Sequence, residues 1–514
     1  MSHLVVLPVV LPALLAPFII MVIRHHIDLQ RIFSVAGTAA LVAICIALTA
    51  QAATGEIVVY DLGDWPAPFG IVLVLDRLSA LMILLTSTLA FLVVLYAVWS
   101  GWDQRGQHFH ALFQFQLMGI LGAFLTGDAF NLFVFFEVLL IASYGLMIHS
   151  GGATRLRAGV QYVVYNLLGS TLFLFALGAL YAVTGTLNMA DLAVRVAELP
   201  PDDTALIRVG AVLLLLVFAV KAAVLPLHFW LPASYSNAPA PVAALFAIMT
   251  KVGAYAILRM YTLVFAPDLE ITAGLVATWL LPAAVMTLGI GAIGIMGASQ
   301  IMRLAAFSAI MSMGTLLISI SLFDVVATGA AIYYIVHSTF ATAMLFLVAD
   351  LVTERRSGRI TPATPMVHGG IIAVLFFAAA VAMAGMPPLS GFLGKLLVMD
   401  AARAAPNWGV IWGFILVSSL VCILGLARAG SLVFWKSHDP TLEPRDWADG
   451  REVNDLPDQT LPAALPMIAV FAMFGVIIAL TLFAGPVMRY ADATAAQLYD
   501  PTPYIETVLR RASE

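Results

Sequence analysis

Lys221 lies within the apolar run 207–231, and Pro226 and His228 follow it within about two helical turns. An ionisable side chain at membrane depth costs roughly 2.5–3.5 kcal/mol on insertion scales, so it is usually retained for a function. Proline removes a backbone donor, and a membrane tolerates the interruption only where other groups satisfy the freed backbone. The segment therefore predicts a discontinuous helix that places Lys221 in an ion path.

Glu137 is the carboxylate that could act together with Lys221. It lies among phenylalanine and leucine residues in the apolar run 129–149, where a carboxylate needs a partner or a proton. Desolvation weakens the proton affinity of a lysine and a nearby carboxylate strengthens it. A Glu–Lys pair that opens and closes would therefore switch a proton on and off, whereas a permanent ion pair would only fix helix packing.

Further ionisable side chains lie in other apolar runs. Lys251 has long apolar stretches on both sides, which disfavours snorkelling of its ammonium group to an interface. Lys395 follows two adjacent prolines in the run 370–401, so a lysine again accompanies a predicted break. His228 and His337 could each carry protons, or each could be a hydrogen-bonded packing residue, and the sequence leaves both alternatives open.

The composition limits the class of protein. The chain has 514 residues, of which 62% are hydrophobic and 10% are charged, against about 25% charged residues in soluble domains. The net charge of −5 does not indicate a nucleic-acid partner. The two cysteines match no metal, iron–sulfur or disulfide spacing, so we expect neither a metal site nor a redox cofactor.

About fourteen apolar runs are long enough to span a lipid bilayer. They cover residues 4–23, 32–52, 71–99, 108–126, 129–149, 158–183, 207–231, 240–263, 273–297, 302–322, 326–351, 370–401, 408–435 and 461–487. We expect an all-α integral membrane protein with a short amphipathic interfacial helix at 187–199 and a polar cytoplasmic docking loop at 438–459. The tail after Arg489 could be a loosely ordered end or an amphipathic helix.

Basic residues predict the orientation. Of the 24 lysines and arginines, twelve fall in alternate loops, and such loops face the cytoplasm. This pattern places both termini outside in a multi-pass protein of the bacterial inner (plasma) membrane.

Two interrupted helices in corresponding halves of a chain are typical of inverted repeats with a path near the midplane. We therefore predict two inverted five-helix repeats, with broken helices 7 and 12. The expected division is 1–107 for three N-terminal helices, 108–263 for the first repeat, 273–435 for the second repeat, and 436–514 for the cytoplasmic loop, the last helix and the outer tail.

Three weaker features have simple interpretations. Asp76 and Arg77 suggest a local ion pair, and Asp350 lies near a helix end, where exposure would explain it. Residues 289–294 match GxGxxG but follow no strand, so close helix packing is the better explanation than dinucleotide binding.

Four segments carry a family resemblance: NLFVFFEVLLIASY, VKAAVLPLHFWLPASYSNAPAPVAALFAIMTKVGAY, RLAAFSAIMSMG and GMPPLSGFLGK. They resemble the antiporter-like proton-pumping subunits of respiratory complex I and of Mrp-type cation/proton antiporters. The resemblance covers nearly the whole chain and implies fourteen core helices, inverted repeats and two broken helices. Lys395 and the stretch IYYIVHSTFATAMLFLVADL favour the D-type subunits of the Mrp branch.

By this resemblance, Glu137 and Lys221 form the coupled pair, Lys251 is the central relay and Lys395 is the outlet. Many relatives carry a lysine one turn after His337, where this chain has Ala341-Thr342-Ala343.

The resemblance implies a transporter subunit, not an enzyme, that exchanges Na⁺ or K⁺ for protons beside other membrane subunits in the lipid bilayer. The alternative is a proton-pumping subunit of a complex I-like NADH–quinone oxidoreductase or a membrane-bound hydrogenase. A purely structural membrane scaffold is disfavoured by the charges expected at the midplane.

Overall fold

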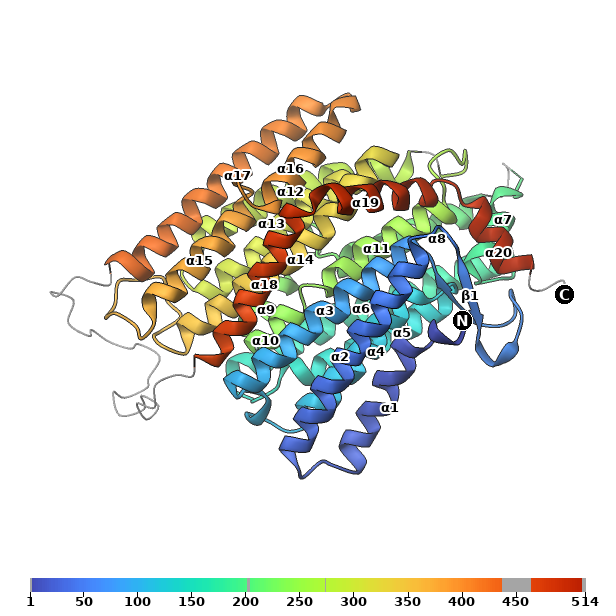
Figure 1. Cartoon of the computed structure of the whole chain (residues 1–514). Coiled ribbons are helices and arrows are strands. Elements are labelled where there is room, and N and C mark those ends of the chain that lie inside the picture. Colours follow the sequence, from blue (N-terminus) through green and yellow to red (C-terminus); the bar gives the residue numbers. More distant parts are fainter. Residues whose placement is uncertain (1, 201–203, 273, 437–463, 511–514) are drawn as a thin grey trace.

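A computed structural model describes residues 2–200, 204–272, 274–436 and 464–510, and this part of the chain is mostly helical (Figure 1). The predicted docking loop 438–459 lies outside the described residues. The helices are α1 Leu7–Met21, α2 Ile27–Ala52, α3 Arg77–Ser100, α4 Phe109–Leu125, α5 Ala129–Met147, α6 Ala153–Thr184, α7 Met189–Ala197, α8 Ala205–Lys221, α9 Trp230–Asn237, α10 Ala240–Leu245, α11 Met249–Leu263, α12 Leu275–Gly297, α13 Ile301–Ser321, α14 Val325–Thr353, α15 Gly369–Ala384, α16 Ser390–Ala401, α17 Trp408–Gly430, α18 Leu465–Leu482, α19 Ala484–Leu498 and α20 Thr502–Arg510.

Each predicted span corresponds to one helix or to a pair of shorter helices, so the predicted all-α membrane fold is confirmed. Ten helical segments of the described chain are long and apolar enough to cross a membrane, and α1, α4 and α15 are shorter apolar helices. The predicted short helix at 187–199 is α7, whose first turn is capped by the Asn188 side chain.

The predicted span 71–99 is wrong at its start. Val72–Leu75 is strand β2, which pairs antiparallel with β1, Val58–Asp61. A short apolar run suits either a strand or a helix, and hydropathy does not distinguish the two. Helix α3 begins only at Arg77, because the Asp76 carboxylate accepts the Ser79 backbone N–H at 2.8 Å and the Ser79 hydroxyl accepts the Asp76 N–H.

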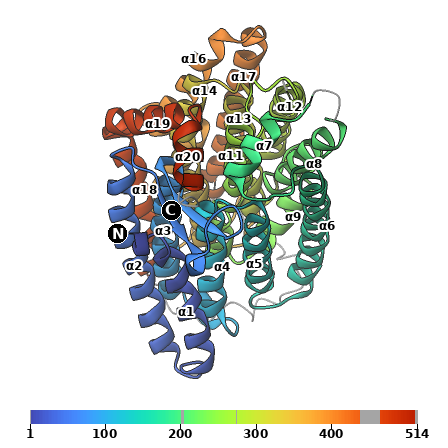
Figure 2. The ribbon, with the colours of Figure 1, turned by 90° about the vertical axis from the view of Figure 1, so that its right-hand side faces the viewer.

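The described part of the tail, which ends at Arg510, is mostly helical and packs on the bundle, so the loosely ordered alternative is wrong for these residues. Helices α19 and α20 form a C-terminal strap, residues 484–510, across one end of the bundle (Figures 1 and 2). The Tyr490 hydroxyl donates to the Arg77 carbonyl at 2.8 Å, and the Arg77 N–H donates to Gln497 Oε1 at 3.0 Å. Helix α20 then packs against α7, so the strap joins the second half of the chain to the first.

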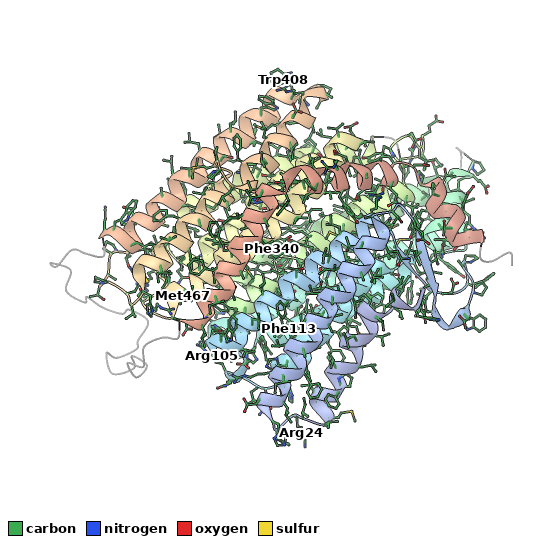
Figure 3. The ribbon with its side chains drawn as sticks, in the orientation of Figure 1. Arg24, Arg105, Phe113, Phe340, Trp408 and Met467 are labelled. Carbon is green, nitrogen blue, oxygen red and sulfur yellow. The ribbon has the colours of Figure 1, made fainter. Side chains whose placement is uncertain are left out.

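Two arginines of the predicted cytoplasmic loops lie toward the same end of the bundle. Arg24 and Arg105 lie toward the end of the bundle opposite to Trp408 (Figure 3). Near the two ends of the chain, the short helical turn Ser2–Leu4 and helix α20 both contact β1 (Figure 1). Which end of the bundle faces the cytoplasm stays a prediction.

The GxGxxG stretch serves close packing of α12 on α13, as predicted. A Cβ at Gly291 would lie 2.4 Å from the Met311 backbone nitrogen, and one at Gly314 would lie 2.4 Å from the Leu288 backbone nitrogen. Small residues let two helix backbones approach in a membrane, where lipid removes the hydrophobic advantage of burying a large side chain.

We expect Gly291→Ala to destabilise the protein by about 1–3 kcal/mol, because the added methyl group must displace backbone atoms of α13. Gly289→Ala is the matched control two residues away, since a Cβ there meets only the Phe414 ring edge at 3.9 Å. Thermal unfolding of the two purified variants measures the difference. Equal melting temperatures would contradict this packing role of Gly291.

Candidate functional site

The predicted break in the run 207–231 is present. Helix α8 ends at Lys221, and α9 begins only at Trp230. The Trp230 indole N–H donates to the Val220 carbonyl at 3.0 Å, and the Leu225 N–H donates to Thr287 Oγ1 of α12 at 2.9 Å. Side chains thus satisfy backbone groups that a continuous helix would pair, as an interruption at membrane depth requires.

Lys221 is buried at the last residue of α8, with 6% of its surface exposed. Its Nζ donates to Asn166 Oδ1 of α6 at 3.1 Å and lies 5.7 Å from the centre of the Phe136 ring. The negative end of the α8 dipole also favours a cation at this position. Lys221 borders a cavity of about 10 Å³, close to the space one water needs. The cavity is lined by Phe136, Leu139, Asn166, Lys221, Trp230, Met249 and Val252.

Glu137 on α5 is separated from Lys221. The Ser170 hydroxyl of α6 donates to the Glu137 carboxylate, whereas the Lys221 ammonium donates to Asn166 of the same helix. Within the described residues the two groups form no direct ion pair. Asn166 and Ser170 lie four residues apart on α6, so one helix face holds both members of the predicted pair in a separated arrangement.

Sequence reasoning did not identify Asn166 and Ser170. The sequence feature that could have identified them is a pair of polar side chains, four residues apart, inside the apolar run 158–183. Such residues are inconspicuous beside a lysine or a glutamate, but each provides the hydrogen bond that its charged partner makes here.

The sequence suggested that Lys251 lies in the middle of a regular helix, and this prediction is wrong. The run 240–263 is distorted between α10 and α11, where the Met249 N–H reaches back only to the Phe246 carbonyl at 3.0 Å. The Tyr235 hydroxyl donates to the same Phe246 carbonyl at 2.9 Å. A competing side-chain donor and three-residue hydrogen bonds are typical of a local helix distortion. Lys251 therefore lies in the first turn of α11.

Lys251 is fully buried, and its Nζ has no hydrogen-bond partner within the described part of the chain. Two residues on, Gly253 brings α11 directly against the broken end of α8. A Cβ at Gly253 would lie 2.7 Å from the Ala222 backbone nitrogen and 2.8 Å from the Phe218 carbonyl oxygen. The helix that carries Lys251 thus packs on the break that carries Lys221.

His228 lies inside the first break and is 5% exposed. Its Nδ1 finds no hydrogen-bond partner among the residues that the structure describes, and its ring packs on Phe229 with 4.5 Å between centroids. Because α8 stops at Lys221, the two residues do not share one helical face. Within the described residues, no hydrogen bond joins His228 to Lys221 or Lys251.

The second predicted break separates α15 from α16. Lys395 of α16 folds back, and its Nζ donates to the Ala384 carbonyl at the end of α15 and to Ser419 Oγ of α17, each at 2.8 Å. Gly385 has a φ of 76°, and a Cβ there would lie 2.6 Å from Lys395 Cδ. As at Lys221, an ammonium group lies at the C-terminal end of a half-helix, where the helix dipole favours a cation.

His337 on α14 connects the centre of the molecule to the second break. It is 2% exposed, and its Nδ1 shares a hydrogen bond with Ser390 Oγ, at the start of α16, at 2.8 Å. A Cβ at Gly391 of α16 would lie 2.8 Å from His337 Nε2, so His337 lies against the same break as Lys395. Lys251 lies on the helix that packs on the first break, and all three basic side chains are buried. The relay and packing interpretations of His337 both remain predictions.

Two interpretations of weaker features are wrong. Asp76 pairs with Arg259 of α11, with N–O distances of 2.6 and 2.9 Å, and not with its neighbour Arg77. Asp350 is 3% exposed, and it accepts hydrogen bonds from the Tyr96 hydroxyl at 2.7 Å and the Trp102 indole at 2.9 Å. Sequence proximity cannot identify such partners, because each comes from a distant helix or loop.

These features define a class of protein: a polytopic membrane protein with two interrupted helices and a row of buried basic groups between them. The chain belongs to the family described as NADH:quinone oxidoreductase/Mrp antiporter, TM, which matches residues 126–423. It is a multi-pass membrane protein of a transporter family and not an enzyme, as predicted.

Curated relatives cover nearly the whole chain. The D-type subunit of a probable K(+)/H(+) antiporter of Rhizobium meliloti (strain 1021) is 38% identical over 99% of this chain and 98% of its own length. The D-type subunit of the Na(+)/H(+) antiporter of Alkalihalophilus pseudofirmus is 37% identical over 99% and 100%. A chain of the Mrp complex from Dietzia sp. DQ12-45-1b is 29% identical, with a TM-score of 0.85 over 99% of this chain and 100% of its own. The predicted membership of the D-type subunits is thereby confirmed.

Proposed function

We propose that this chain moves protons across the membrane as a subunit of a multisubunit antiporter that exchanges protons for Na⁺ or K⁺. The observation that carries the proposal is the row of buried basic side chains across both helix breaks: Lys221, Lys251, His337 and Lys395. Several ionisable groups at this depth are costly, and such groups usually mark an ion path. The names of the two curated relatives support proton exchange against a monovalent cation.

The separated Glu137–Lys221 pair is one state of the proposed switch. When the carboxylate approaches, the ammonium is stabilised and Lys221 keeps its proton. When Glu137 stays on Ser170 and Lys221 stays on Asn166, burial favours release of that proton. The cavity beside Lys221 has room for about one water, which could take the proton towards Lys251.

From Lys251 the proposed path continues through His337 to Lys395, the outlet residue. His337 is joined to the second break by Ser390, and Lys395 caps that break through the Ala384 carbonyl. The path needs no lysine after His337, where the chain has Ala341-Thr342-Ala343. His228 could contribute from the first break if water joins it to Lys221. The two breaks also support the proposed inverted repeats, 108–263 and 273–435.

The partners and the placement follow from the same proposal. The chain lies in the inner (plasma) membrane of a bacterium with both termini outside, and other membrane subunits of the antiporter cover its flanks. The relatives are named for K⁺ in one case and Na⁺ in the other, so either ion is a candidate.

A second candidate is a proton-pumping subunit of a complex I-like oxidoreductase. The description of the matching family includes NADH:quinone oxidoreductase, and this observation favours it. The two functions share the buried basic row and differ in their energy source. The proton-motive force drives cation exchange in the first, and an electron donor drives proton pumping in the second.

Inside-out vesicles from antiporter-deficient cells that express the whole complex distinguish the two. A pH gradient is built with ATP, and Na⁺ or K⁺ is then added while a dye reports the internal pH. We expect the added cation to collapse the gradient rapidly, and vesicles without the complex provide the control. Proton pumping that depends on an electron donor, with no response to either cation, would support the second candidate instead.

A further inference from the structure

A stripe of polar side chains runs along α11 from Lys251 towards the end of the bundle that carries the strap. Lys251, Tyr255 and Arg259 lie at positions i, i+4 and i+8, which places them on one face of the helix. Eight residues of α-helix span about 12 Å. The stripe therefore begins at a buried ammonium group without a hydrogen-bond partner in the described structure and leads away from the first helix break, on which Gly253 packs.

Hydrogen bonds connect the outer half of this stripe. The Arg259 Nε donates to the Tyr255 hydroxyl at 3.4 Å, and that hydroxyl donates to the Phe124 carbonyl of α4 at 2.7 Å. Long helical side chains lean towards the helix N-terminus, so Tyr255 covers the turn on the Lys251 side of its own Cα. The phenol is the side chain between the central lysine and the arginine.

A buried ion pair closes the outer end of the stripe. Arg259 and Asp76 are 4% and 2% exposed, and two parallel N–H···O contacts of 2.6 and 2.9 Å join them. Beside the pair lies a cavity of about 10 Å³. Its lining includes Thr262 of α11 and Gln497 and Tyr504 of the C-terminal strap.

The strap supplies the cover of this ion pair. Tyr504 of α20 is 4% exposed, and its ring centre lies 5.3 Å from the Arg259 guanidinium carbon. Gln497 of α19 holds the start of α3, next to Asp76, through the Arg77 N–H. The strap lies across one end of the bundle (Figure 2): α19 packs on the spanning helices α14 and α3, whereas α20, which carries Tyr504, packs on the short helix α7 and on β1.

We infer that Lys251, Tyr255 and Arg259 form an outer-side proton access to the central lysine, which the Asp76–Arg259 pair and Tyr504 hold closed. This inference rests on the proposed function, because it assumes that Lys251 carries a proton. This access would connect Lys251, in the first half of the chain, to the outer side by a route separate from the outlet at Lys395. In an exchanger that takes protons inward, this connection is an entry route. A purely structural pair would only fasten α3 to α11.

The experiment measures passive proton leak through the assembled complex in vesicles without Na⁺ or K⁺. Asp76→Asn combined with Arg259→Gln removes both charges at similar size, so no unpaired charge remains buried. We expect the pH gradient to decay several-fold faster than with the wild-type complex. Adding Lys251→Met to this double variant should return the leak to the wild-type rate, because the route then lacks its inner end.

The matched control is Asp191→Asn combined with Arg195→Gln. This ion pair on α7 has a distance of 3.0 Å and its arginine side chain is 48% exposed, so its neutralisation should not change the leak. An assembled Asp76/Arg259 variant without a leak would overturn the inference, as would a leak that persists with Lys251→Met. If the double variant does not assemble, Tyr504→Leu uncovers the pair without removing a charge, and the same two outcomes decide.

Failure of the inference is distinguishable from failure of the proposed function. The leak measurement needs no exchanged cation, whereas the wild-type response to Na⁺ or K⁺ in the same vesicles tests the function by itself.

Discussion

Lys221→Ala is expected to abolish cation-dependent proton exchange while the complex still assembles. Among the described residues that line the cavity at the first break, Lys221 is the only one whose side chain can both bind and release a proton. Loss of a positioned proton-transfer group costs about 10²–10⁴-fold in rate in enzymes, and a loss of similar size would remove measurable exchange. Dye-monitored exchange in vesicles, with complex assembly followed by affinity purification, checks this result.

Lys436→Ala is the control for Lys221→Ala. The chain has four lysines, and Lys436 is the exposed one, directly after the end of the spanning segment that contains α17. Its replacement should leave exchange unchanged, because water solvates an exposed ammonium group and burial therefore does not favour release of its proton. Normal exchange by an assembled Lys221→Ala complex would contradict the Glu137–Lys221 switch, whatever the control shows.

Lys251→Met is expected to abolish exchange and also to stabilise the protein. Methionine has nearly the length of lysine and packs well in apolar surroundings. The Lys251 ammonium is fully buried and has no hydrogen-bond partner in the described chain. Removal of an unsatisfied buried polar group is worth on the order of 1–3 kcal/mol, so the free energy of unfolding should rise by about this amount. The purified complex should therefore melt at a higher temperature although it no longer transports.

Met260→Leu provides the comparison for Lys251→Met, since it changes a buried apolar side chain of the same helix that does not line the cavity beside Lys221, and it should affect neither property strongly. A Lys251→Met complex that melts at a lower temperature would mean that the ammonium has a stabilising partner. Retained exchange would show that the proton path avoids Lys251. A substitution that raises the stability of the protein and abolishes its transport is typical of a residue that functions at a cost in folding free energy.

The sequence predicted both helix breaks and their lysines correctly. Each break depends on prolines that cannot continue a helix and on a charge whose desolvation is costly wherever the helix lies. These are properties of one segment, so they can be read without knowing its neighbours. The same holds for GxGxxG, which packs α12 against α13 through Gly291. Hydropathy similarly located the spans, because bilayer thickness sets their length.

The sequence misjudged features that depend on a neighbouring segment. The residues 72–75 are apolar enough for a helix, but β1 is available to pair with them. Lys251 follows a helix distortion because the Tyr235 hydroxyl reaches the Phe246 carbonyl. The tail is ordered because its helices find α14, α3 and α7 to pack on.

The partners of the charged groups were decided only by the tertiary structure. Asn166 for Lys221, Ser170 for Glu137 and Arg259 for Asp76 all come from other helices, dozens of residues away or more. A buried charge needs some partner, and the cost of desolvation makes that need visible in the sequence. Which side chain meets it depends on the faces that two helices turn towards each other, and packing of the whole bundle determines those faces.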